Sequence, residues 1–153
     1  MNTAVLCVGK LRERFWREAA DEYEKRLSRF GHFEEIEIPD KPEGSDPARV
    51  IREEGQELLR RIREDDLVVA LCIEGKACSS PELADFMKKQ EASGRRVVFV
   101  IGGSLGLSPE VVSRARVRLS FSPMTFPHQL ARVMLLEQIY RACKINAGER
   151  YHK

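Results

Sequence analysis

Three short, continuous runs of apolar residues constrain the fold of this chain more than any other feature. They cover residues 4–8, 67–73 and 97–101, and helix-like segments stand between them. Uninterrupted apolar runs are typical of strands that are buried on both faces of a parallel sheet, because a strand with one wet face alternates apolar and polar residues. The alternation of strands and helices predicts a single α/β domain over residues 1–153, with a mostly parallel sheet flanked by helices.

The segments between these runs carry the signals that begin and end helices. A proline follows a capping residue in Asp46-Pro47, Ser80-Pro81 and Ser108-Pro109, which predicts three helix starts, and Gly94 is placed to end the second of these helices. Further elements are expected as helices over 15–29 and 128–146, strands over 33–38 and 117–121, and a flexible loop over 39–46.

Composition excludes several classes of protein. The chain has 153 residues, 42% of them hydrophobic and 33% charged, which is ordinary for one globular core. No apolar run approaches the roughly 18 residues of a membrane span, and no signal peptide is evident, so a cytoplasmic protein is expected. The cysteines form no C-x-x-C pair and are expected to be free thiols, and the three histidines are too scattered to predict a metal site.

Charge is distributed unevenly along the chain. Residues 1–94 contain 16 Lys and Arg against 21 Asp and Glu, whereas residues 95–153 contain 10 against 3. A basic C-terminal third is what a surface that binds a polyanion requires. A solvated basic surface without a partner would explain the same count.

A glycine-rich segment follows the most apolar run. Residues 101–106 read Ile-Gly-Gly-Ser-Leu-Gly, and glycines at the end of a buried strand let the backbone approach a ligand closely. Ligands of parallel sheets bind beyond the carboxyl ends of the strands, where loops over 74–80, 102–107 and 122–127 are expected to gather. The segment is neither a P-loop nor a dinucleotide fingerprint, and a tight turn without a ligand would also explain it.

A second unusual loop covers residues 120–128, with the sequence Ser-Phe-Ser-Pro-Met-Thr-Phe-Pro-His. Its two aromatic side chains and its methionine could enclose a flat apolar group such as adenine. Packing of the loop onto the core is the alternative. The helix that follows is apolar nearly all round, which predicts that it contacts a second surface, most economically in a homodimer.

These blocks together resemble a known family. The resemblance is carried by Ile101-Gly102-Gly103 with Gly106-Leu107-Ser108, by residues 119–128, and by the side chains that follow them, which are Arg132, Glu137, Gln138, Tyr140, Arg141, Tyr151 and His152. The chain resembles the bacterial SPOUT family of 23S ribosomal RNA pseudouridine N3-methyltransferases, the large-subunit methyltransferase H family, over essentially its whole length.

The resemblance implies a fold and a cofactor. The C-terminal part would form a trefoil knot, an exception to the rule that chains do not thread themselves. S-adenosyl-L-methionine would bind in the knot, and no metal would be needed. The implied cofactor-binding residues are Leu71, Gly102, Gly103, Phe121, Ser122, Pro123, Met124, Thr125 and Phe126.

The resemblance also implies a substrate and a homodimer. The substrate would be the pseudouridine at family position 1915, in helix 69 of 23S ribosomal RNA, methylated on assembled ribosomes. Its N3 carries a proton, so a general base or a positive group should assist. We expect His152 to act as this group, Tyr151 to stack on or hydrogen-bond to the base, and Arg141 to stabilise charge on the uracil oxygens. Candidate phosphate contacts are Arg132, Lys144, Arg150 and Lys153.

Two other functions remain open at this point. A ribosome-binding or assembly factor without catalytic activity would bind RNA but not the cofactor. A nucleotide-binding enzyme of the flavodoxin type would need a phosphate cradle after the first strand, where Gly9 is the only glycine. A hydrolase is not indicated, since Ser104 and Ser122 have no evident histidine and aspartate partners.

Overall fold

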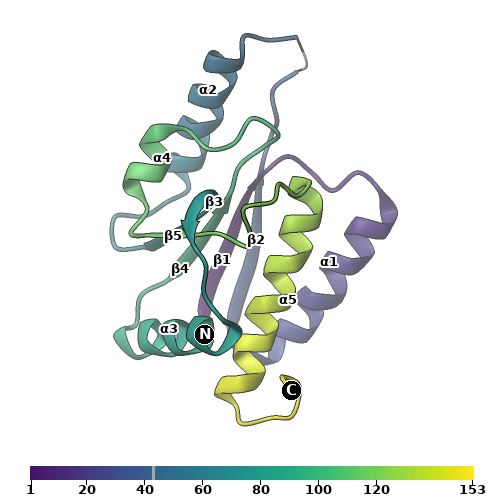
Figure 1. Ribbon diagram of the computed structural model, residues 1–153, viewed down its shortest axis with the longest axis vertical. Helices are drawn as coiled ribbons and strands as arrows, with labels where there is room; N and C mark the ends of the chain where they lie inside the picture. The colour runs from purple at the N-terminus through teal and green to yellow at the C-terminus, as the bar shows by residue number, and fades with distance from the viewer. Residues whose placement is uncertain (43) are drawn as a thin grey trace.

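The computed structural model describes residues 1–42 and 44–153, so residue 43 of the expected 39–46 loop lies outside the description. Strands and helices alternate along the chain, as expected (Figure 1). The elements are β1 (Asn2–Val8), α1 (Arg14–Leu27), a 3-10 turn η1 (Ser28–Phe30), β2 (His32–Ile38), α2 (Pro47–Arg60), β3 (Leu67–Lys76), α3 (Ser80–Ser93), β4 (Val97–Ile101), α4 (Pro109–Arg114), β5 (Val117–Leu119) and α5 (His128–Asn146).

The five strands form one sheet in the order β2-β1-β4-β3-β5, and every neighbouring pair is parallel. The three expected apolar runs are its central strands, β1, β4 and β3. Val97 of β4 pairs with Thr3 of β1 on one side and with Leu67 of β3 on the other. A mostly parallel sheet flanked by helices is therefore confirmed.

Helices cover both faces of the sheet and make two cores. Successive strand residues point to opposite faces, so Val5 and Cys7 of β1 face one core and Leu6 and Val8 face the other. The first core contains side chains of α1, α3 and α5, and the second contains side chains of α2 and α4. Figure 1 shows α5 lying alongside α1 and reaching down to α3.

The helices begin close to the positions that the sequence predicts, but their capping interactions differ in part. Ser108 accepts a hydrogen bond from the Val111 N–H as expected, and Gly94 ends α3 in the left-handed conformation. The cap of α3 is Ser79 rather than Ser80, because Ser79 and Glu82 bond each other's backbone N–H in a capping box. Asp46 precedes Pro47 at the start of α2, but its side chain caps nothing.

The strands around β5 differ most from expectation. β3 extends to Lys76 instead of ending at Ile73, and β5 ends at Leu119 instead of Phe121. The register of this pair shifts between Leu71 and Lys76, where the intervening residues bulge out of the ladder. The N–H of Ser120 bonds the carbonyl of Lys76 beyond the shift. No helix of the described residues is long and apolar enough to cross a membrane.

A buried ion pair joins the amino-terminal ends of three strands. Arg96 donates two hydrogen bonds to the carboxylate of Asp66, at 2.9 and 2.6 Å, and one to Glu34 of β2 at 3.0 Å. The side chains of Arg96 and Asp66 are 6% and 1% exposed. Burial opposes ionisation of Asp66, but its hydrogen bonds from Arg96 and from the Arg63 N–H lower its pKa below the ordinary value.

We expect Asp66→Ala to lower the free energy of unfolding by about 3–5 kcal/mol, because it leaves the charge of Arg96 buried without its main partner. Urea unfolding followed by circular dichroism measures the loss. Asp65→Ala removes an exposed neighbouring carboxylate and should change stability by about 0.5 kcal/mol or less. Since the folded-state pKa of Asp66 is lowered, its contribution is present at neutral pH and is lost as the pH falls through that pKa. Equal losses in the two variants would contradict this role.

Candidate functional site

Three loops meet at one edge of the sheet. Because β4, β3 and β5 are parallel neighbours, their carboxyl ends open on the same side, and the loops that follow them lie together. Leu71 is the last residue of β3 before the register shift, and it is half-buried beside Leu119 of β5. The structure thus brings three of the segments expected to bind the cofactor to a common edge.

The glycine segment after β4 is a tight turn. The N–H of Gly106 bonds the carbonyl of Gly103 at 3.0 Å, and Gly106 has a φ of 87°, in the left-handed region. Gly102 is buried, and a Cβ on it would lie 2.7 Å from the carbonyl carbon of Gly106. A side chain at Gly102 would force this turn open, so the turn presents backbone at Gly102, Gly103 and Gly106, and side chains only at Ser104 and Leu105.

The loop after β5 is organised by its serines. The hydroxyl of Ser120 donates to the carbonyl of Ser122, and the Ser122 hydroxyl accepts from the N–H of Met124 at 3.0 Å. Phe121 packs against the core, whereas Met124 is 72% exposed. Of the residues expected to bind the cofactor in this loop, Pro123 and Thr125 are also exposed, and Phe126 is half-buried.

Exposed apolar side chains are concentrated at this edge. Among the described residues the large ones are Phe15, Ile73, Leu105 and Met124. Leu105 and Met124 come from the loops after β4 and β5, and Ile73 comes from the bulged end of β3. Apolar side chains left in water at this edge, beside the glycine turn, suit a ligand with a flat apolar part.

A pocket of about 560 Å³ connects the third loop to α5. Ser120 and Phe121 line one side, and the start of α3 lines another. The remaining wall is formed by Tyr23 of α1 and by Val133, Met134, Glu137 and Gln138 of α5. The hydroxyl of Ser80 closes part of it by donating a hydrogen bond of 2.6 Å to Oε1 of the Gln138 side chain. Its volume lies in the range of ligand-binding pockets.

Glu137 also organises the three expected catalytic residues. Its Oε1 accepts hydrogen bonds from Arg141 at 2.7 Å and from the Tyr151 hydroxyl at 3.2 Å. Arg141 lies over the Tyr151 ring, with 4.7 Å to the ring centre, and its Nη1 lies 3.4 Å from Nδ1 of His152. Sequence reasoning assigned no role to Glu137, although its position one helical turn before Arg141 is a signal that could have identified it.

The arrangement of His152 indicates which hydrogen it carries. A guanidinium can only donate, so in this contact Nδ1 of His152 accepts from Arg141 and the ring proton stands on Nε2. The side chain of His152 is exposed. Burial, and then the charge of Glu137, raise the pKa of Tyr151, which keeps its hydroxyl protonated.

Arg132 is not placed to contact phosphate, which corrects one expectation. Its side chain is 8% exposed and is held by Glu35 and Glu37, with N–O distances of 2.7 and 2.8 Å. The pair of carboxylates neutralises its charge beneath α5. Burial raises the pKa of Glu35 despite this contact. Arg132 therefore anchors α5 to β2, and an isolated sequence position could not reveal this because its partners lie about a hundred residues away.

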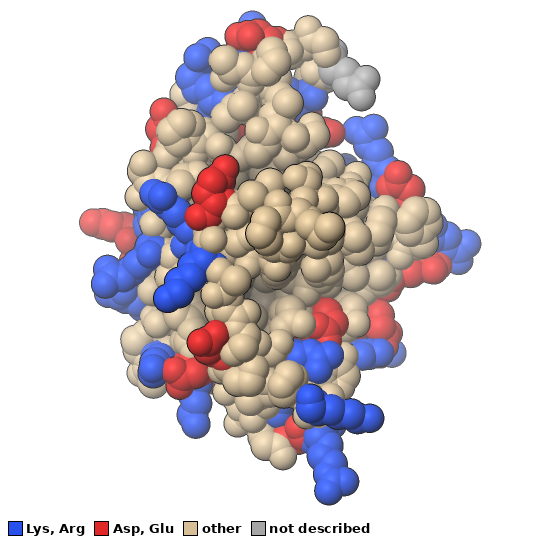
Figure 2. All heavy atoms as spheres, in the orientation of Figure 1, with Lys and Arg blue, Asp and Glu red and all other residues tan. Residues whose placement is uncertain are grey.

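The other basic residues of the expected RNA surface differ in availability. Lys144 is mostly covered and binds Glu149, which also accepts from Arg29. Hydrogen bonds from Arg29 and Lys144 lower the pKa of Glu149 to about 2. Arg150 and Lys153 are exposed on the tail. Figure 2 shows basic side chains gathered at the lower end of the molecule, whereas the surface over the first half of α5 is largely uncharged.

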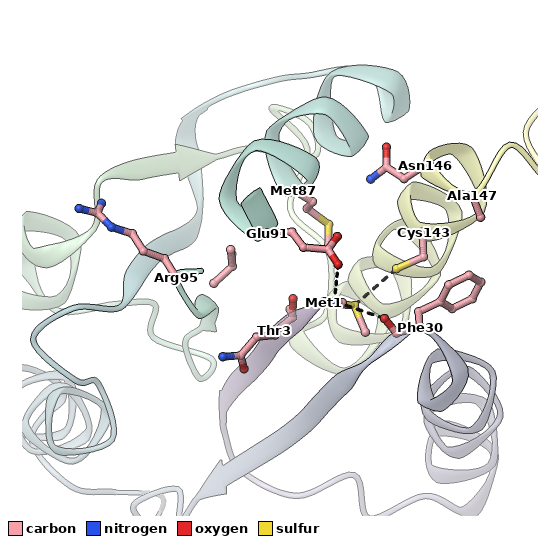
Figure 3. Close-up of a pocket in the computed structure, with 11 residues that line it drawn as sticks. Met1, Thr3, Phe30, Met87, Glu91, Arg95, Cys143, Asn146 and Ala147 are labelled. Atoms are coloured by element: carbon pink, nitrogen blue, oxygen red, sulfur yellow. Dashed lines mark hydrogen bonds and ion pairs between the residues drawn. The ribbon is translucent and has the colours of Figure 1, made fainter. Parts of the chain in front are cut away.

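A smaller pocket of about 200 Å³ lies at the opposite edge of the sheet (Figure 3). Its walls include Thr3 and Val97, which stand at the beginning of β1 and β4. The N-terminal ammonium bonds Glu91 at 2.8 Å within it, and the sulfur of Met1 contacts that of Cys143. The ammonium also bonds the carbonyl of Phe30, and the pocket lies where the strands begin, remote from the three loops. Within the described residues no group of His, Cys, Asp and Glu could hold a metal ion.

The chain matches known proteins over its full length. The family model described as "Predicted SPOUT methyltransferase" matches residues 1–152. Curated relatives named "Ribosomal RNA large subunit methyltransferase H" include those of Clostridium novyi, 50% identical over 100% of both chains, and Bifidobacterium animalis, 53% identical over 100% of both.

Solved structures of lower identity share the fold. A probable methylase family protein from Haemophilus influenzae has a TM-score of 0.57 at 16% identity, covering 99% of this chain and 70% of that one. A probable methyltransferase from Bordetella pertussis has a TM-score of 0.56 at 13% identity, covering 93% and 96%. The full-length family match and the relatives at about half identity show that this chain belongs to the SPOUT methyltransferase family.

Proposed function

We propose that this protein is an S-adenosyl-L-methionine-dependent methyltransferase that methylates N3 of a pseudouridine, at family position 1915 in helix 69 of 23S ribosomal RNA, on assembled ribosomes in the cytoplasm. One observation carries the proposal: a single pocket has Phe121 of the expected cofactor loop on one wall and Glu137, the partner of Arg141 and Tyr151, on another. The names of the curated relatives support ribosomal RNA as the substrate.

The carboxyl edge fits the cofactor. Its glycine turn offers backbone groups to the polar edges of an adenine or a ribose, and the apolar side chains of Ile73, Leu105 and Met124 can cover an adenine ring. Residues 71, 102–103 and 121–126 would hold the cofactor. When bound, it supplies an electrophilic methyl group, so no metal is needed for the transfer.

The cluster on α5 prepares the acceptor. The N3 proton must leave before N3 can form its bond to the methyl carbon, and the negative charge that remains spreads onto the uracil oxygens. Arg141 would supply positive charge and the Nε2–H of His152 a hydrogen-bond donor to these oxygens, which favours release of the proton to water. Tyr151, fixed by Glu137 and Arg141, offers an aromatic face to the base.

A trefoil knot and a homodimer are part of this proposal. Support for the knot comes from the close approach of β5 to the bulge of β3, where a Cβ on Gly75 would lie 2.7 Å from the carbonyl carbon of Leu119. The uncharged surface over the first half of α5 supports a second subunit there, because half-buried Val133 and Met134 lie on that helix. Of the expected phosphate contacts, exposed Arg150 and Lys153 remain the best placed.

Methyl transfer to ribosomes tests the function directly. Labelled S-adenosyl-L-methionine is incubated with the protein and with whole ribosomes, free large subunits or naked RNA, and the modified nucleoside is identified by mass spectrometry. We expect methylpseudouridine chiefly on whole ribosomes. Binding to ribosomes without transfer, and without cofactor binding, would instead support an assembly factor.

The glycine turn should be needed for cofactor binding. We expect Gly102→Ala to weaken S-adenosyl-L-methionine binding by at least about tenfold, because the new Cβ forces the backbone of Gly106 away. Isothermal titration calorimetry measures the dissociation constant. Ser104→Ala changes an exposed side chain of the same turn and should leave binding unchanged. A normal dissociation constant for Gly102→Ala would place the cofactor elsewhere.

The C-terminal tail, residues 147–153, should act in methyl transfer rather than in cofactor binding. We expect His152→Ala to bind the cofactor normally but to lose about a hundredfold in kcat, the usual effect of removing one donor to developing charge. His152→Gln keeps an N–H donor without a basic nitrogen, so partial activity in this variant supports the donor role. If Gln is as inactive as Ala, His152 acts as the base, and unchanged turnover in both would remove the tail from catalysis.

A further inference from the structure

A buried carboxylate behind the glycine turn has no part in the mechanism above. Glu54 stands on α2 and is only 5% exposed. Its Oε2 accepts a hydrogen bond of 3.3 Å from the N–H of Lys41, in the loop after β2. Burial raises the pKa of Glu54, which the hydrogen bond from Lys41 only partly offsets.

The same carboxylate forms the floor of the glycine turn. A Cβ built on Gly103 would lie 3.3 Å from Oε1 of Glu54 and 3.2 Å from Cγ1 of Val8. Gly103 is therefore seated between a β1 side chain and the Glu54 carboxylate. Since Gly103 accepts the hydrogen bond that closes the turn at Gly106, the depth of the turn depends on how close Glu54 stands.

Gly55, which follows Glu54 in α2, brings this helix against Ser108, at the far end of the loop that begins with the glycine turn. A Cβ on Gly55 would lie 2.3 Å from the hydroxyl of Ser108, so the helix approaches the start of α4 as closely as a backbone can. Ser108 is itself tied to α4 by its bond from the Val111 N–H. Glu54 and Gly55 thus hold both ends of residues 103–108 with little freedom to shift.

We propose that Glu54 is a positioning residue, which holds the 102–106 turn at the depth needed to bind the cofactor and links it to the loop after β2. This rests on the proposed function, because the turn is assigned to the cofactor there. Glu54 acts through Gly103 and Lys41 rather than on the cofactor itself. This role requires a side chain long enough to reach Gly103 and an oxygen that accepts the hydrogen bond from Lys41, and glutamine supplies both.

The first test needs no cofactor. Amide hydrogen exchange of the free protein, followed by mass spectrometry, should show faster exchange over residues 40–41 and 103–107 in Glu54→Ala than in wild type. Glu57→Gln, one turn further along α2 and paired with Arg60 at the surface, should show wild-type exchange. Wild-type exchange in Glu54→Ala would overturn the proposal, whatever the reaction of this protein.

The second test measures cofactor affinity by isothermal titration calorimetry. We expect Glu54→Ala to raise the dissociation constant of S-adenosyl-L-methionine about tenfold, and Glu54→Gln to stay within about threefold of wild type. Glu54→Asp, which keeps the charge but withdraws it by one methylene, should weaken binding and serves if the alanine variant does not fold. Gln as weak as Ala, or Asp equal to wild type, would overturn the positioning role. Wild-type protein that binds no cofactor would refute the proposed function, while the exchange result would still stand.

Discussion

Burial of the three central strands on both faces is the constraint on which the rest of this structure depends. Strands β1, β4 and β3 can hide their apolar side chains only if helices cover the sheet above and below. Parallel pairing satisfies this requirement, since each strand is followed by a helix that returns the chain to the end of the sheet where the strands begin. As a consequence all five strands end at one edge, and the loops with unusual sequences meet there.

The site follows from interruptions of this regular sheet. The register shift between Leu71 and Lys76 takes the intervening residues of β3 out of the ladder, and pairing with β5 resumes at Lys76. The glycine turn after β4 replaces side chains by backbone at the point where the three loops converge. Both interruptions need tertiary support, which β5 supplies for the first and Glu54 of α2 for the second.

Three arginines show how burial assigns different roles to one residue type. Arg96 is buried with Asp66 and ties strand ends together, and Arg132 is buried with Glu35 and Glu37 and anchors α5. Arg141 is partly exposed, and Glu137 orients it toward Tyr151 and His152 rather than neutralising it in the core. Arginines count equally toward a basic C-terminal third, yet only those that still reach solvent can meet a phosphate or a base.

The sequence by itself determined the α/β class, the order of the elements, the bounds of β4 and α5, and the two loops with unusual composition, because apolar periodicity, caps and glycines act locally. It also supported the family through residues 101–108 and 119–152. Only the tertiary structure decided that Arg132 is an anchor, that Glu137 joins Arg141 to Tyr151, and that Glu54 supports Gly103. These contacts join residues far apart in the chain, and a carboxylate or guanidinium has no role until its partner and its exposure to water are known.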